Sequence, residues 1–371
     1  DYRRNEVLGF LRSQKLEDLC ISRPAARLGW GIPLPFDPAY VNYVWFDALT
    51  NYFSVPAAAG DPQAVACLDG YYQRQQALPA TPSEAASCWP ADLHVIGKDI
   101  VKFHAVYWPI MLHAAGAPLP AKVLVHGWWQ KDGQKLSKST GNVVDPLAVV
   151  DEWGLDAFRY YVVRELDIGP DGNWTDAGFS ARYHAELANG LGNLLNRALN
   201  MLNKYRDGVV PPVSRELEAD AHAAVRAAEA ELRGYQLQGA LGAIWGLVNR
   251  ANQYVEQTQP FKLAKDPAQA ERLDAVLYNL VESCRILAVL LWPFMPGTAT
   301  RIQAQLGLTG EPNVWTGAAW GGLTAGHRVG NPEPLFPRKD PPPPPRSPLN
   351  PATPASGNAP DAGPCSPPCH S

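Results

Sequence analysis

Residues 134–142 read QKLSKSTGN, and this short stretch decides the interpretation of the whole chain. Two lysines, Lys135 and Lys138, bracket Ser137, and an apolar run at 123–125 comes shortly before them. Such a loop offers two ammonium groups and several hydroxyls to a polyphosphate, because lysine binds phosphate as a compact point charge. For a bare Lys-x-x-Lys pair, a solvated basic loop is the simpler interpretation. The longer pattern, placed after an apolar strand and an Asp-Gly turn, favours a phosphate-binding loop.

Size and composition indicate a globular protein of two or three domains, since the chain has 371 residues and is 46% hydrophobic. The net charge of −4 does not point to nucleic acid, although a local basic groove can still bind phosphates. The six cysteines form no Cys-x-x-Cys pair, so we expect neither a zinc site nor a disulfide framework. No apolar run is long enough to span a bilayer. We therefore expect a cytoplasmic protein with no membrane partner.

Apolar periodicity in the first half of the chain predicts short strands separated by helices, which is typical of a parallel sheet with crossover connections. The predicted strands are 43–45, 94–96 and 123–125, and the predicted helices are 5–16, 47–53 and 100–115, the last one kinked or restarted at Pro109. Residues 60–90 interrupt the pattern and are expected to form an irregular excursion.

After about residue 180 the strand pattern ends. Helical spacing covers roughly 180–206, 215–258 and 268–292, which predicts an antiparallel helical bundle. From residue 337 the chain is rich in proline and cannot bury enough apolar surface to fold, so we expect a disordered tail.

The turn Gly97-Lys98-Asp99 follows a predicted strand and opens a helix. Doubly wound sheets place their ligands at this position, where glycine allows close approach of the backbone and the helix N-terminus favours anions. Asp99 can accept hydrogen bonds from ribose hydroxyls. The alternative is a turn glycine followed by an ordinary N-cap aspartate.

Four residues in the first half are candidates for a pocket that binds a modest apolar side chain. Trp45, Ala48 and Tyr52 have the spacing of one helix face, and His104 lies on the helix after the glycine turn. Aromatic edges favour a thioether sulfur. Ordinary core packing is the competing interpretation.

Three residues in the second half are candidates for reading an unpaired base. Asn193 and Arg197 lie four residues apart on a predicted helix, and Phe261 follows Pro260 after another long helix. An amide, a guanidinium and an aromatic plane supply hydrogen bonds to the base edge and a stacking surface. The alternative is helix-surface polarity and one buried phenylalanine.

Taken together, these segments resemble the methionyl-tRNA synthetase family, and the lysine loop resembles the KMSKS signature of class I aminoacyl-tRNA synthetases with leucine in place of methionine. The resemblance covers about residues 1–336. It rests on VWFDALTNY at 44–52, HVIGKDIVKFH at 94–104, His126-Gly127, KLSKSTGN at 135–142, LGN at 191–193 and QPF at 259–261.

The resemblance implies a role for each candidate. Trp45, Ala48, Tyr52 and His104 would line a methionine pocket. Gly97, Asp99, His126, Gly127 and Ser137 would contact ATP, and Lys135 and Lys138 would neutralise the departing pyrophosphate. Asn193 and Arg197 would read the anticodon, and Phe261 would stack on a base less strongly than the tryptophan usual at that position.

The resemblance also implies the fold and the reaction. We expect a partial Rossmann-like parallel sheet followed by an all-α anticodon-binding bundle. The expected domains are 1–23 (the end of a connective insertion), 24–128 (the second half of the catalytic domain), 129–180 (the lysine loop and stem-contact region), 181–336 (the anticodon-binding bundle) and 337–371 (the tail). Methionine would be activated by ATP with Mg²⁺ and transferred to tRNA(Met). We expect a monomer, and we expect the lysine loop and the aromatic pocket to face one cleft.

The resemblance has a limit and leaves alternatives open. The His-Ile-Gly-His turn and the zinc knuckle of the family would precede residue 1. We therefore expect an internal start, and we expect that these residues alone do not form methionyl-adenylate at a useful rate. Another class I synthetase remains an alternative, as does a non-catalytic module that binds the tRNA anticodon.

Overall fold

The computed structural model describes most of the chain, namely residues 2–13, 15–42, 44–58, 89–131, 133–136 and 143–339, apart from the side chains of 44–47, 53, 57 and 135. The expected excursion at 60–90 falls almost entirely outside these residues, and so does the expected tail after 337. The five domain limits stay predictions.

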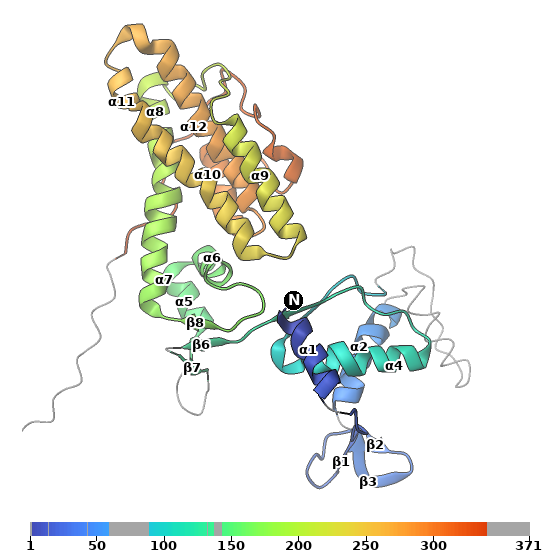
Figure 1. Cartoon of the computed structure of the whole chain (residues 1–371). Coiled ribbons are helices and arrows are strands. Elements are labelled where there is room, and N and C mark those ends of the chain that lie inside the picture. Colours follow the sequence, from blue (N-terminus) through green and yellow to red (C-terminus); the bar gives the residue numbers. More distant parts are fainter. Residues whose placement is uncertain are drawn as a thin grey trace, which may run out of the picture. The chain divides into compact units, whose positions relative to one another are not determined.

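The first half contains the strands, as expected (Figure 1). Its strands are β1 Ser22–Pro24, β2 Pro33–Leu34, β3 Asp37–Asn42, β4 His94–Gly97, β5 Val123–His126, β6 Trp129–Lys131, β7 Gln134–Lys135 and β8 Gly172–Trp174. Its helical segments are α1 Tyr2–Ser13, α2 Val44–Ala58, the 3₁₀ turn η1 Lys98–Ile100, the π-helical turn η2 Phe103–Tyr107, α4 Trp108–Ala115, α5 Pro146–Trp153 and α6 Leu155–Glu165.

Within the described residues, the strands form three small sheets. β4 and β5 pair in parallel, with His94 opposite Val123 and Gly97 opposite His126. The second sheet is antiparallel, in the order β1-β3-β2, and the third has the order β7-β6-β8 with β6 parallel to β8. The crossover from β4 to β5 runs through η1, η2 and α4, which is the parallel connection that the sequence predicts.

The strand predicted at 43–45 is wrong. The strand lies earlier, at Asp37–Asn42, where it pairs with β1 and β2, and Val44 begins helix α2. A short run of β-branched and aromatic residues does not by periodicity alone distinguish a strand from the start of a buried helix. The predicted helix at 100–115 is present, but it does not restart at Pro109: the backbone stays helical and passes through the π-helical turn η2 directly before α4, in whose first turn Pro109 lies.

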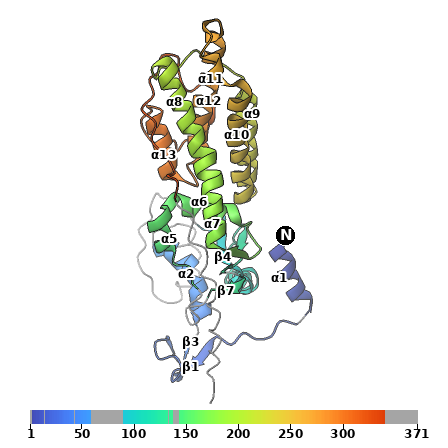
Figure 2. The same cartoon turned by 90° about the vertical axis from the view of Figure 1, so that its left-hand side faces the viewer.

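The second half is helical, and the bundle is seen from two sides in Figures 1 and 2. Its elements are α7 Asp176–Arg182, the π-helical η4 Tyr183–Gly192, α8 Asn193–Arg206, α9 Glu218–Arg233, α10 Leu237–Thr258, α11 Pro260–Leu263, the 3₁₀ turn η5 Pro267–Gln269, α12 Ala270–Leu291, α13 Pro296–Gln305 and the 3₁₀ turn η6 Trp315–Ala318. The single helical pattern at 215–258 is divided into α9 and α10 at Tyr235, whose φ of 59° breaks the helix.

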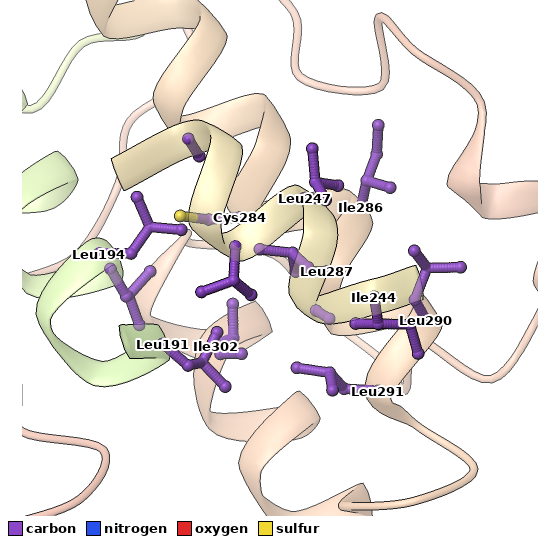
Figure 3. Packing of buried hydrophobic residues seen from close by; sticks show 14 of the residues in the cluster. Leu191, Leu194, Ile244, Leu247, Cys284, Ile286, Leu287, Leu290, Leu291 and Ile302 are labelled. Atoms are coloured by element: carbon purple, nitrogen blue, oxygen red, sulfur yellow. The ribbon is translucent and has the colours of Figure 1, made fainter. Parts of the chain in front are cut away.

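Helix α12 is the centre of the bundle. Every residue from Val276 to Leu291 is buried, so this helix has no solvent face over that length. Figure 3 shows Leu287, Leu290 and Leu291 of α12 together with Ile244 and Leu247 of α10. Helices α8 and α13 also pack against α12. This core therefore draws on residues that are far apart in the sequence.

A buried ion pair in α12 also holds the backbone of the loop at residues 321–323. Glu282 is fully buried, and its carboxylate accepts hydrogen bonds from Arg285 at 3.0 and 2.7 Å. The same carboxylate accepts the backbone N–H groups of Gly321, Gly322 and Leu323. Because each charge has its partners, the pair is tolerated in the core.

None of the helices in the described ranges combines the length and the apolar character needed to cross a membrane.

Candidate functional site

Tyr52 and His104 lie together at the centre of the predicted pocket. His104 is 2% exposed, and its Nδ1 is 3.0 Å from the carbonyl oxygen of Ile100. A carbonyl can only accept, so Nδ1 carries the proton and Nε2 of the neutral ring is an acceptor. The Tyr52 hydroxyl, 2.9 Å from Nε2, therefore donates to it. The hydrogen bond to Ile100 thus fixes the tautomer of His104, and the hydrogen bond between Tyr52 and His104 fixes the direction of the Tyr52 hydroxyl.

Aromatic rings surround this pair. The ring of His94 lies 4.3 Å from that of Tyr52 and 5.9 Å from that of His104, measured between centroids, and Trp108 lies 6.2 Å from Tyr52. An open cavity of about 350 Å³ adjoins Tyr52 and His94; its other walls come from Asn51, Val55, Pro56, Ala91, Leu93 and Val95, and His104 does not line it. Such walls suit an uncharged side chain of modest size.

The pocket holds its histidines neutral. Burial lowers the pKa of His104, with the hydrogen bond to Ile100 opposing the shift. Burial also lowers the pKa of His94, and the nearby His104 lowers it further. Burial raises the pKa of Tyr52. The Nε2 atom of His94 is buried without a hydrogen-bond partner among the described residues. All three groups are therefore uncharged near neutral pH.

Trp45, Ala48 and Tyr52 all lie on α2. Ala48 comes three residues after Trp45, and Tyr52 comes four residues after Ala48. This spacing places them on one face of the helix, as the sequence predicts. Ala48 is partly buried. The side chain of Trp45 lies outside the described set, so its place in the pocket stays a prediction.

The predicted nucleotide contacts gather at the carboxyl ends of β4 and β5. Gly97 pairs with His126, and Asp99 follows in η1. A Cβ on Gly97 would stand 2.6 Å from Oδ1 of Asp99, and one on Gly127 would stand 1.9 Å from the carbonyl oxygen of Pro170. The turn at Gly127 therefore needs glycine, because the obstacle is backbone, whereas at Gly97 the Asp99 side chain could move aside. The carboxyl ends of parallel strands are where open α/β sheets bind ligands.

The lysine loop is described only at its base. Lys135 is in β7, where its backbone pairs with Gln130 of β6. Its side chain, and all of Ser137 and Lys138, fall outside the described residues. The prediction that this loop and the aromatic pocket face one cleft therefore stays a prediction.

The predicted base-reading residues lie in the helical half. Asn193 is exposed at the start of α8, and Arg197 follows one turn later. Nη2 of Arg197 forms an ion pair with Glu256 of α10 at 2.7 Å. Phe261 in α11 is 44% exposed, so its ring is available to a partner. The ion pair links Arg197 to the end of α10 that leads into Phe261.

Four residues near these sites were missed by sequence reasoning: His94, Lys98, Trp128 and Asp171. His94 begins the strand that ends at Gly97, and Lys98 stands inside the glycine turn, so proximity could have suggested both. Asp171 is brought to Lys98 only by the fold, at 2.5 Å. No spacing rule connects two residues so far apart in sequence.

Metal ligands do not cluster in the part of the chain that the structure describes: no three His, Cys, Asp or Glu side chains come together there.

Two family models match the chain. The model "tRNA synthetases class I (M)" matches residues 2–199, and the model "Anticodon binding domain of methionyl tRNA ligase" matches residues 206–340. The sequence and the helical second half agree with this pair of matches.

Curated relatives and solved structures agree with the models. The chain is 43% identical to the methionine--tRNA ligase of Caldanaerobacter subterraneus over 91% of its own length and 50% of the relative. It is also 43% identical to that of Bacillus subtilis, over 91% and 49%. The structure of Mycobacterium tuberculosis methionyl-tRNA synthetase in complex with methionyl-adenylate gives a TM-score of 0.76 at 40% identity, covering 91% of this chain and 63% of that one.

The fold predicted from the sequence is thus confirmed as that of the class I tRNA synthetases. The chain belongs to the methionyl family of that class. It spans about half the length of the curated relatives that it matches.

Proposed function

We propose that the chain carries the methionine pocket, part of the ATP site and the anticodon-reading surface of a methionine--tRNA ligase. In this reaction the methionine carboxylate attacks the α-phosphate of ATP, and methionyl-adenylate and pyrophosphate form. The terminal ribose hydroxyl of tRNA(Met) then takes the methionyl group and releases AMP. The protein contributes positioning and charge stabilisation in the first step.

The observation that carries the proposal is the hydrogen bond between Tyr52 and His104 inside an aromatic, uncharged pocket. Tyr52 donates to His104, so the hydroxyl oxygen keeps its lone pairs as acceptors. A thioether side chain gains contact with the aromatic edges and meets no unpaired charge. Trp45 and Ala48 would complete the pocket from α2.

ATP would lie against the two glycine turns. Gly97 would let the backbone approach the nucleotide, Asp99 would accept from a ribose hydroxyl, and His126 and Gly127 would lie beside the adenine. Magnesium would accompany ATP.

The lysine loop would close on the phosphates. Ser137 would contact ATP, and Lys135 and Lys138 would neutralise the charge that develops on the departing pyrophosphate.

The helical half would recognise tRNA(Met). Asn193 and Arg197 would hydrogen-bond an anticodon base, and the exposed ring of Phe261 would stack on it. Glu256 would hold the guanidinium of Arg197 in place before binding. We propose a monomer that acts in the cytoplasm.

Methionine binding by the 371-residue chain tests the proposal. Saturation-transfer NMR at millimolar ligand should show contact with L-methionine and not with L-lysine, because the pocket is neutral. Tyr52→Phe removes the hydrogen bond that orients His104, and it should weaken methionine binding by about 0.5–1.5 kcal/mol, the usual net contribution of one hydrogen bond. Tyr205→Phe, in the helical half, is the matched control and should leave binding unchanged.

Two outcomes separate the candidate functions. Wild-type chain that binds tRNA(Met) but no methionine would favour the non-catalytic anticodon-binding module. Binding of leucine as strongly as methionine would favour another class I synthetase. Methionine-dependent exchange between ATP and pyrophosphate tests the expectation that these residues alone do not form methionyl-adenylate, and detectable exchange would contradict it.

A further inference from the structure

Asp171 occupies a junction that the proposed chemistry does not use. It lies in the loop between α6 and β8, and its side chain is 28% exposed. One carboxylate oxygen is 2.5 Å from Nζ of Lys98, and the other accepts the backbone N–H of Trp128 at 2.9 Å. Lys98 belongs to the Gly97–Asp99 turn, and Trp128 directly follows Gly127. The carboxylate therefore joins the two glycine turns.

Trp128 contacts both Lys98 and Asp99 of the Gly97–Asp99 turn. Its ring lies 4.3 Å from Nζ of Lys98, a cation–π contact, and its Nε1 donates to Oδ1 of Asp99 at 3.4 Å. Asp99 is the residue proposed to hold the ribose. The chain of contacts thus runs from Asp171 through Lys98 and Trp128 to Asp99.

The loop that carries Asp171 is itself held firmly. Arg3 of α1 donates to the carbonyl oxygen of Gly169 from Nε at 3.1 Å and from Nη2 at 2.6 Å. The carbonyl of Pro170 fills the space beside Gly127. Lys98 and the Trp128 N–H hold the pKa of Asp171 below its usual range. The carboxylate is therefore charged, and it faces a fixed lysine at neutral pH.

The same loop leads into the sheet that contains Lys135. Gly172 follows Asp171 and donates its N–H to the carbonyl of Trp128 at 2.9 Å. β8 then pairs with β6, and β6 pairs with β7, which ends at Lys135. One side chain thus connects the turn on the ribose side with the sheet that contains Lys135.

We propose that Asp171 is a positioning residue for ATP: through Lys98 and Trp128 it fixes Asp99 and the Gly97 turn relative to the Gly127 turn. This inference rests on the proposed function, since it concerns the same nucleotide site. Asp171 touches no substrate in this role. It sets the distance between two groups that do.

Substitutions separate the charge of Asp171 from its hydrogen bonding. Asp171→Asn keeps an oxygen that accepts the Trp128 N–H but loses the attraction for Lys98. It should raise the dissociation constant of MgATP about fivefold, which corresponds to the loss of one partly exposed ion pair. The affinity for methionine should not change. Lys98→Arg should retain wild-type ATP affinity, because it keeps the charge, whereas Lys98→Met should match Asp171→Asn.

Hydrogen exchange gives a readout that does not depend on ATP. Asp171→Ala should accelerate exchange of the Trp128 amide, while Asp171→Asn should leave it protected. Glu229→Ala is the control, because Glu229 forms a similar ion pair with Arg233 on the exposed surface of α9. It should change neither ATP affinity nor exchange in residues 126–131.

The outcomes distinguish the inference from the proposed function. If wild-type chain binds no MgATP, the proposed ATP site is wrong and the role of Asp171 falls with it. If wild-type binds MgATP and Asp171→Asn binds it equally well, only the inference is overturned. Equal loss of ATP and methionine affinity in Asp171→Asn also overturns it, since that result indicates general structural damage.

Discussion

The strand-bearing half and the helical half bury their side chains in very different ways. One continuous core runs from Ala157 to Phe336 and surrounds α12; it joins α6 and β8 of the strand-bearing half to the helical half. The other described parts of the strand-bearing half bury their apolar side chains in two small clusters, one around Trp89 and Trp108 and one around Ile96. Hydrophobic stabilisation scales with buried apolar area, so most of it lies in the helices.

This difference in packing indicates where a substitution should change binding alone and where it should also change stability. In the helical half, the residues proposed to contact tRNA lie outside the core, and the core packs without them. In the strand-bearing half, Tyr52 of the proposed pocket packs against the small cluster that contains Trp108, and its ring also contacts that of His104. Substitutions there should change binding and local stability together, whereas in the bundle the two should separate.

The largest expected effect comes from Glu282→Ala. This change leaves the buried guanidinium of Arg285 without its counter-ion and three backbone N–H groups without an acceptor. It should cost about 3–5 kcal/mol of unfolding free energy, measured by urea denaturation followed by circular dichroism. Glu229→Ala on exposed α9 should cost well under about 1 kcal/mol. A similar loss in both variants would mean that the core is not more sensitive than the surface.

Arg197→Ala should have the next largest effect, and it should affect recognition alone. Loss of one specific base contact should cost about 1–3 kcal/mol in affinity for tRNA(Met). Methionine affinity and unfolding free energy should stay nearly unchanged, because Arg197 is partly exposed and Glu256 is 66% exposed. Filter binding with tRNA(Met) and a tRNA of altered anticodon measures the effect. If stability falls as much as affinity, Arg197 is a structural residue and the proposed separation fails.

The smallest effect should come from pH, and it should be confined to the strand-bearing half. The pKa of His94 and that of His104 are both lowered by burial from the ordinary value of 6.5. The unfolded chain therefore takes up these protons first as the pH falls. Their contribution to stability is complete above about pH 6.5 and is lost as the pH falls through the folded-state pKa values.

Thermal unfolding between pH 5 and 8 checks this prediction. The transition of the strand-bearing half should move to lower temperature below pH 6.5. A variant with His94→Asn and His104→Gln should show a smaller shift over the same range. An unchanged pH dependence in that variant would assign the effect to other groups.

Much of the fold could be predicted from the sequence where a pattern is local. The spacing of Val276, Leu280 and Leu287 predicts the central helix, and the run at 123–125 predicts β5. The start of α2 could not be predicted, because Val44 and Trp45 suit a strand as well as a helix, and pairing with β1 decides that the strand ends at Asn42. Helix α13 was missed because only a few apolar residues mark it.

The same distinction, between local sequence patterns and contacts that form only on folding, applies to the candidate site. Tyr52 and His104 could be predicted as neighbours only through family resemblance, and the structure adds the hydrogen bond that orients them. The roles assigned to the site residues stay predictions. Asp171 could not be predicted at all, because its partner Lys98 comes from a distant turn and the contact exists only after folding.

The contact between Gly127 and Pro170 fixes the spacing between two loops of the molecule. Where any other residue would begin its side chain, the carbonyl oxygen of Pro170 already stands, 1.9 Å from the position of a methyl carbon. At this point the two loops touch through main chain, and peptide groups have no rotamers with which to adjust; the Asp171 carboxylate, which accepts the Trp128 N–H, adds a side-chain contact beside it. Any side chain at position 127 would therefore have to push away the backbone of Pro170 and Asp171.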